Sequence, residues 1–183
     1  MQEAVPIGEG GMAAILGLTF EEVRDICTPF LDPNFYCGVA NDNSPGQVVV
    51  SGHQNALNMV CQKAQEKGVK RMIRLPVSAP FHSPLMKKAA EQMKTLLSQT
   101  LINRPKWPII MNVTARPLQP QESIADLLVQ QMTSRVRFRE SIEFLKYLEK
   151  PIFIEMVTGK VLTNLVKRML PESTVLPFNK PED

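Results

Sequence analysis

The sequence of 183 residues lacks most features that mark nucleic-acid-binding, membrane-spanning and secreted proteins. It has no long run of lysine and arginine, its net charge is only +3, and aromatic residues make up 6% of it, so a nucleic-acid surface is not indicated. No apolar stretch approaches the roughly 20 residues that a membrane span needs. Residues 1–11 show neither the basic nor the apolar region of a signal peptide. We therefore predict a soluble, cytoplasmic protein without nucleic-acid or membrane partners.

Cysteine is also scarce. The three cysteines, Cys27, Cys37 and Cys61, form no C-x-x-C pair, and their number is odd. Cys27 and Cys61 fall on the apolar faces of predicted helices, so we expect buried free thiols in a reducing compartment. We predict neither a metal site nor a bound cofactor.

Hydrophobic residues make up 44% of the chain, enough for a sizeable core in one domain or two small ones. After an irregular lead-in over residues 1–10, the pattern alternates between strand and helix. In order, we expect a strand over 12–18, a helix starting at the capping box of Thr19 and Glu22, strands over 35–41 and 47–51 joined by a turn at 43–46, a helix over 53–67 and a strand over 69–77. This β-α-β-β-α-β order over residues 11–77 is typical of a ferredoxin-like subdomain.

The pattern changes after residue 77. We expect helices over 84–98, 121–132, 139–149 and 161–169, with strands over 107–113, 152–156 and 175–178. The nearly continuous apolar runs at 107–113 and 152–156 are typical of parallel strands that are buried on both faces. Residues 78–183 therefore predict a second α/β unit with a parallel sheet layer.

His82 is one of only two histidines and falls where the first unit ends and a helix begins. Ser83 is a good N-cap, and Pro84 suits the first position of that helix. An imidazole at such a corner can face a cleft, and its neutral form can accept a proton as a general base. The alternative is a surface or capping histidine at the end of a loop.

Several segments together resemble the malonyl-CoA:acyl carrier protein transacylase family, the acyltransferases of fatty acid and polyketide synthesis. In chain order, the similar segments are residues 1–6, 11–18, 43–52, 77–86 and 159–163. The resemblance implies a ferredoxin-like subdomain (11–77) followed by the C-terminal part of an α/β-hydrolase-like subdomain (78–183). It also implies ping-pong transfer of malonyl from malonyl-CoA to a serine, and then to the phosphopantetheine thiol that the partner acyl carrier protein carries. His82 matches the general base.

The resemblance suggests roles for four further residues. Gln131 matches a glutamine whose backbone carbonyl orients the catalytic histidine, although it could also be a polar residue that ends a helix. Asn41 and Asn43 match residues near the coenzyme A cleft, and turn chemistry would explain them equally well. Phe81 could narrow the acyl pocket against branched groups or belong to the core. The chain departs from the family pattern at Arg135, where proline is frequent, and at 157–160, where Gly-Pro-Gly-Lys is frequent.

None of the nine serines lies in the G-x-S-x-G motif that carries the nucleophile of this family. The family's early glutamine loop and the arginine that pairs with the malonyl carboxylate have no counterpart either. We therefore expect the C-terminal portion of a transacylase, inactive alone, with a complementary N-terminal segment supplied elsewhere.

Two other interpretations remain open at this point. One is a non-catalytic ferredoxin-like module that binds acyl carrier protein or another protein. The other is an unrelated ferredoxin-like protein that binds a small molecule or RNA.

Overall fold

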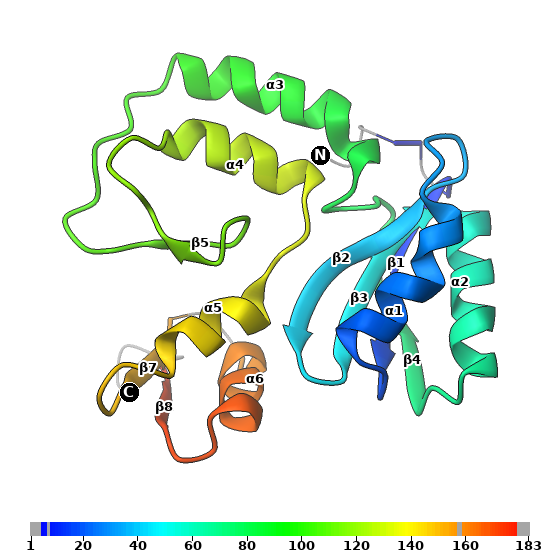
Figure 1. Ribbon diagram of the computed structural model, residues 1–183. Coiled ribbons are helices and arrows are strands. Elements are labelled where there is room, and N and C mark those ends of the chain that lie inside the picture. The colour runs from blue at the N-terminus through cyan, green and yellow to red at the C-terminus, as the bar shows by residue number, and fades with distance from the viewer. Residues whose placement is uncertain (1–4, 7, 157–158, 179–183) are drawn as a thin grey trace.

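The chain folds into two lobes of helices and strands (Figure 1). The structure is a computed structural model that describes residues 5–6, 8–156 and 159–178. The first lobe contains β1 (Gly10–Leu16), α1 (Phe20–Cys27), the 3₁₀ turn η2 (Thr28–Phe30), β2 (Cys37–Ser44), β3 (Gln47–His53), α2 (Gln54–Glu66) and β4 (Arg71–Arg74). The second contains the 3₁₀ turn η3 (Pro84–Met86), α3 (Lys87–Ser98), β5 (Ile110–Met111), β6 (Arg116–Pro117), α4 (Ile124–Thr133), α5 (Phe138–Leu145), β7 (Ile152–Glu155), α6 (Val161–Met169) and β8 (Thr174–Pro177).

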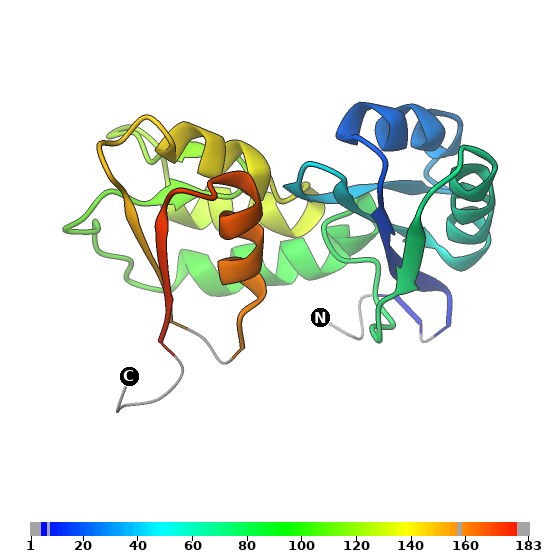
Figure 2. The ribbon, with the colours of Figure 1, turned by 90° about the horizontal axis from the view of Figure 1, so that it is seen from below.

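The first lobe is an antiparallel sheet with strand order β2-β3-β1-β4. Alternate residues of β1 face opposite sides of this sheet, as strand geometry requires. Ala13 and Ile15 face α1 and α2 and belong to the main core with Val23, whereas Met12 and Ala14 face the other side. Figures 1 and 2 show α1 and α2 on one side of the sheet and the start of α3 on the other.

Local signals in the sequence set the elements of this lobe. The Thr19–Glu22 capping box is confirmed, because the Thr19 side chain accepts from the Glu22 N–H and the Glu22 carboxylate accepts from the Thr19 N–H. The β2–β3 turn is confirmed at Pro45–Gly46, where Gly46 has φ +71°. The strand predicted over 12–18 ends instead at Leu16, because Gly17 turns the chain with φ +104°.

The strand predicted over 69–77 is correct only for Arg71–Arg74. Leu75 still donates to the Met12 carbonyl, but Pro76 has no N–H with which to continue the ladder. Cys27 and Cys61 are free and buried in this lobe, as predicted, and Cys37 is free and buried too.

The outer edge of β2 is covered by the connection between α4 and α5. Val136 donates to the Ala40 carbonyl at 2.8 Å, and Asp42 donates to the Val136 carbonyl at 2.9 Å. These two bonds form a parallel bridge between Asn41 and Val136. Irregular register on both sides of Asn41 and Asp42 bends β2 where this bridge lies. The bridge joins the two lobes.

In the second lobe, the strand predicted over 107–113 is wrong. Only Ile110 and Met111 are extended, they pair antiparallel with β6, and the Trp107 side chain is 81% exposed. An apolar run becomes a buried parallel strand only when strands flank it on both sides, and Pro108 removes one donor. Among the described residues, no parallel strand lies beside this run.

The parallel pairing expected further along the chain is present between β7 and β8. The expected burial of this region is wrong, however, because Ile152 is 65% exposed and Ile154 is 55% exposed. The helix at 161–169 is confirmed, and the helix predicted over 139–149 ends at Leu145. The predicted α/β class is therefore correct. The predicted parallel sheet layer is wrong in extent, because among the described strands only β7 and β8 pair in parallel. Within the described ranges, no helix is both long and apolar enough to cross a membrane.

Gly52 allows a test of the packing in this sheet. A Cβ atom at Gly52 would lie 2.1 Å from the Tyr36 carbonyl oxygen, whereas a Cβ at Gly68 would meet nothing within 4 Å. We expect Gly52→Ala to lower the free energy of unfolding by about 3 kcal/mol, the upper end of typical overpacking costs. Gly68→Ala, the matched control at φ +81°, should cost about 1 kcal/mol, the left-handed backbone penalty alone. Equal midpoints of the two variants in urea unfolding would contradict the close packing of β2 against β3.

Candidate active site

His82 lies at the corner between β4 and η3 in a strained backbone conformation. Its φ is +57°, in the left-handed region that residues with a side chain rarely adopt. Ser51 of β3 holds this corner by donating its hydroxyl to the Phe81 carbonyl at 2.7 Å. Ser83 donates its hydroxyl to the Pro80 carbonyl at 2.6 Å. Strain of this kind is often found at functional sites, where the surrounding structure enforces it.

Ser83 has the extended backbone of an N-cap, as predicted, but its side chain makes no capping bond. Its hydroxyl is committed to the Pro80 carbonyl instead. The serine hydroxyl therefore stabilises the turn that positions His82 and accepts no hydrogen bond from the N–H groups that follow.

The His82 ring is fixed by the end of α4. Its Nδ1 lies 3.0 Å from the backbone carbonyl oxygen of Gln131. Gln131 is in the last turn of α4, where backbone carbonyls have no partner within the helix. A carbonyl can only accept a hydrogen bond, so Nδ1 must carry the hydrogen. In the neutral ring, Nε2 is then the unprotonated nitrogen, which is able to accept a proton.

An open pocket of about 480 Å³ adjoins this ring. It is lined by Met12, Asn41, Phe81, His82, Met86, Met93, Gln131 and Met132. The fold thus brings together four of the five residues that the sequence singled out, from β2, the corner before η3, and α4. Asn43 is half-buried in β2 and does not line this pocket. None of the lining residues carries a hydroxyl or a thiol, so within the described chain this pocket holds no hydroxyl or thiol nucleophile.

Met86 and Met93 fall within the helix predicted over 84–98, and sequence reasoning overlooked the role of the methionines in the pocket. The four methionines come from β1, η3, α3 and α4, so their meeting depends on tertiary structure. The one local signal was the seven-residue spacing of Met86 and Met93, two turns of one helix face. Phe81 belongs both to the core and to the pocket lining, because it packs against two apolar clusters and also lines the pocket.

A group of charges surrounds the connection between α4 and α5. Arg135, the first departure from the family pattern, stacks over the Phe20 ring at 4.4 Å and donates to Glu140 at 2.9 Å. Arg137 also binds Glu140. Its guanidinium, helped by Arg135, holds the pKa of the Glu140 carboxyl below its ordinary value. Of the other departure, over 157–160, residues 157–158 lie outside the described residues.

A second ion pair joins β2 to α5. Arg139 binds the Asp42 carboxylate through two of its nitrogens, with distances of 2.8 to 3.0 Å. Burial raises the pKa of the Asp42 carboxyl although Arg139 acts in the opposite direction. Asp42 in turn raises the pKa of the Arg139 guanidinium.

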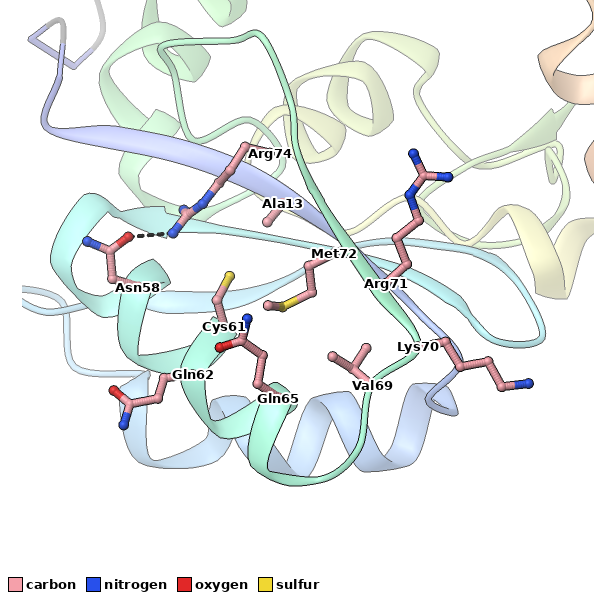
Figure 3. Close-up of a pocket in the computed structure, with 10 residues that line it drawn as sticks. All are labelled: Ala13, Asn58, Cys61, Gln62, Gln65, Val69, Lys70, Arg71, Met72 and Arg74. Carbon is pink, nitrogen blue, oxygen red and sulfur yellow. Dashed lines mark hydrogen bonds between the residues drawn. The ribbon is translucent and has the colours of Figure 1, made fainter.

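Another depression lies between α2 and β4, on the helix-covered side of the sheet (Figure 3). Its lining includes Lys70, Arg71 and Arg74, and Arg74 points toward Asn58. β4 is a short strand at the edge of the sheet, and charged residues on such a strand commonly prevent edge-to-edge pairing. This depression contains no histidine or carboxylate among its lining residues and is separated by the sheet from His82.

His53, the other histidine, has a structural role. It occupies the N-cap position of α2, at the start of the helix predicted over 53–67, and its Nδ1 accepts a hydrogen bond from the Tyr36 N–H at 2.9 Å. Among the described residues, no group of histidine, cysteine, aspartate or glutamate side chains is arranged to hold a metal ion.

Comparison with known proteins places these features in context. The model of the acyl transferase domain family matches residues 1–180. The malonyl CoA-acyl carrier protein transacylase of Bacillus subtilis is 41% identical over 182 residues, which is 100% of this chain and 57% of that protein. The chain therefore spans little more than half the length of such relatives.

Solved structures of malonyl transacylases also match nearly the whole of this chain and little more than half of their own length. An acyl-carrier-protein S-malonyltransferase from Bartonella henselae is 42% identical with a TM-score of 0.92, and the match covers 99% of this chain and 57% of that one. The malonyl CoA-acyl carrier protein transacylase from Clostridium perfringens is 37% identical with a TM-score of 0.93, covering 100% and 57%. A malonyl-transacylase in complex with a type II polyketide synthase acyl carrier protein is 34% identical with a TM-score of 0.92, covering 99% and 58%.

The two histidine rings should show opposite tautomers. His82 should carry its hydrogen on Nδ1, because that nitrogen faces a carbonyl, and His53 on Nε2, because its Nδ1 accepts from an N–H. Two-bond ¹H–¹⁵N correlation spectra at pH 8 distinguish the protonated nitrogen of each ring, and His53→Gln assigns the signals. The same tautomer in both rings would contradict the geometry of the site.

Glu140 should make stability depend on pH. Its pKa is lower in the folded protein than the ordinary 4.5. Its ion pairs therefore stabilise fully above about pH 4.5, and this contribution is lost as the pH falls through the lowered value. We expect Glu140→Gln to lower the free energy of unfolding by about 1 kcal/mol at pH 7, as is typical of partly exposed pairs, and by less at pH 3.5. A urea unfolding difference that does not shrink at pH 3.5 would count against this.

Proposed function

The chain belongs to the acyl transferase domain family, and we propose that it acts in the transfer of malonyl from coenzyme A to acyl carrier protein, with His82 as the general base. The observation that carries the proposal is the imidazole whose Nδ1 is held by the Gln131 carbonyl beside an open pocket. Relatives named for this reaction match the whole chain at about 40% identity. The reaction needs malonyl-CoA and acyl carrier protein as substrates and no resident cofactor.

The proposed chemistry uses one nitrogen of His82. A serine hydroxyl attacks the thioester carbonyl of malonyl-CoA while Nε2 takes its proton, and the carbon–sulfur bond then breaks as Nε2 returns that proton to the sulfur of coenzyme A. In the second half, the phosphopantetheine thiol of acyl carrier protein gives its proton to Nε2 and attacks the serine ester. The ester carbon–oxygen bond then breaks, malonyl remains on the thiol sulfur, and Nε2 returns the proton to the serine oxygen. Each half leaves His82 neutral.

The serine must come from outside the 183 residues, because they contain no G-x-S-x-G. We propose a complementary N-terminal segment as its source. The exposed apolar side chains of β7 and β8, namely Ile152, Ile154 and Leu176, support this. Parallel strands are normally covered on both faces, so such a segment would extend the β7–β8 layer and cover these side chains.

The fold is best interpreted as two subdomains. The chain order and the sheet order β2-β3-β1-β4 support a ferredoxin-like subdomain over 11–77, after a lead-in over 1–10. The parallel β7–β8 pair with α5 and α6 supports assigning 78–183 to an α/β-hydrolase-like subdomain. The proposed base then lies at the corner where one subdomain passes into the other.

The remaining site residues have proposed roles in substrate binding. Asn41 lines the pocket beside His82, where its amide could bind a carbonyl of the substrate. Phe81 lines the same pocket and would limit the size of the acyl group. Asn43, which lies outside this pocket, would contact the part of coenzyme A that remains at the surface. Gln131 acts on His82 through its backbone carbonyl, and its side-chain amide donates to the Ser134 carbonyl.

Intact-mass measurement and a transfer assay test the proposal. With malonyl-CoA, the 183-residue chain alone should gain no malonyl adduct. When combined with the part of the Bacillus subtilis transacylase that this chain does not match, it should transfer malonyl to acyl carrier protein. In that combination, His82→Ala should lower the rate by about 10²- to 10⁴-fold, the usual contribution of a general base.

His53→Gln is the matched control and should leave the rate unchanged, because His53 serves only as an acceptor for the Tyr36 N–H. A stoichiometric adduct on the chain alone, or full transfer by His82→Ala, would overturn the proposal. Binding of acyl carrier protein without any transfer by the combination would favour a non-catalytic module instead.

A further inference from the structure

Asp42 and Arg139 form an ion pair that the chemistry above does not use. The Asp42 side chain, in the middle of β2, is 1% exposed. Arg139 lies in the first turn of α5, 97 residues further along the chain, and its Nε and Nη2 both donate to the carboxylate. A buried carboxylate is costly unless it stays paired. The fork-like geometry therefore sets the position of the start of α5 relative to β2.

The same residue also holds the connection between α4 and α5. The Asp42 N–H donates to the Val136 carbonyl, and the Val136 N–H donates to the Ala40 carbonyl. Arg139 follows Val136 by three residues. Val136 is thus fixed to β2 by two backbone bonds, and Arg139 by the ion pair at the start of α5. Figure 1 shows the connection between α4 and α5 running beside β2.

This connection reaches His82 through Gln131. The Gln131 side-chain Nε2 donates to the Ser134 carbonyl at 3.0 Å, which ties the last turn of α4 to the start of the connection. The Gln131 backbone carbonyl accepts from His82 Nδ1 at 3.0 Å. A continuous series of contacts therefore runs from the ion pair to the imidazole.

We propose that Asp42 and Arg139 are positioning residues for His82, which hold the Gln131 carbonyl where it fixes the ring orientation and the tautomer. The importance of this for catalysis rests on the function proposed above. The effect on the ring itself does not, and it can be measured without substrate.

The test uses the chain labelled with ¹⁵N in its two histidines. Arg139→Met keeps the apolar stem and removes the fork. We expect the exchange of the His82 Nδ1 hydrogen with water to become at least tenfold faster, and the His82 ring signals to move toward the average of the two tautomers. His53, which lies at the end of β3 and accepts from the Tyr36 N–H, should not change. A loss of stability alone would affect both rings equally.

Arg116→Met is the matched control. It removes a similar two-nitrogen pair, between Arg116 and Glu122 near the start of α4, that does not contact β2. It should leave both rings unchanged. If Arg139→Met does not fold because Asp42 is left unpaired, the double variant Asp42→Leu with Arg139→Met removes both charges and carries the same expectation. A folded variant with an unchanged His82 ring, or equal changes in both rings, would overturn the proposal.

A measurement on the unaltered chain covers the case in which neither variant folds. In native-state exchange, the His82 Nδ1 hydrogen and the Val136 amide should open together, with protection factors that agree within threefold. A His82 hydrogen that is at least tenfold less protected than the Val136 amide would overturn the proposal. Failure of any ring experiment leaves the malonyl-transfer result unaffected, and failure of transfer leaves the ring result unaffected.

Discussion

The hydrogen bond between His82 Nδ1 and the Gln131 carbonyl connects two segments that lie 49 residues apart. It requires a free carbonyl at the end of α4 and an imidazole turned toward it by a left-handed backbone. Ser51 and Ser83 supply the contacts that enforce the backbone, and the connection after α4 supplies those that place the carbonyl. The turn before η3 and the connection after α4 can therefore be understood as support for one ring.

The parts of the fold that sequence predicted were governed by local chemistry. The Thr19 capping box, the Pro45–Gly46 turn and the periodicity of 161–169 each depend on residues within a few positions of one another. The corner at His82 was predictable for the same reason, because Pro80 precedes it and Ser83 and Pro84 follow it. Gln131, Asn41 and Phe81 were singled out through the resemblance to a family, because nothing in their local pattern separates them from ordinary helix-end, turn and core residues.

The rest depended on neighbours distant in sequence. The run at 107–113 has the composition of a buried strand, but a strand exists only where another chain segment pairs with it, and β6 pairs with just two of its residues. The methionines around the pocket come from four elements, and Asp42 meets Arg139 across 97 residues. No periodic pattern in the sequence predicts these long-range contacts. Even Ser83, correct as a cap position, directs its hydroxyl to Pro80 because of the strained turn beside it.

The polar and apolar parts of the site have separate tasks. The acid–base half of the proposed reaction is complete within these residues, because tautomer, orientation and backbone strain of His82 are all fixed by contacts in the described chain. The pocket beside it is lined largely by thioethers, which adapt their shape to whatever packs there. A rigid imidazole next to an adaptable surface suits the proposed arrangement, in which the nucleophile belongs to another segment. The proposed base would need no rearrangement on docking of that segment, and the methionines could adjust to its surface.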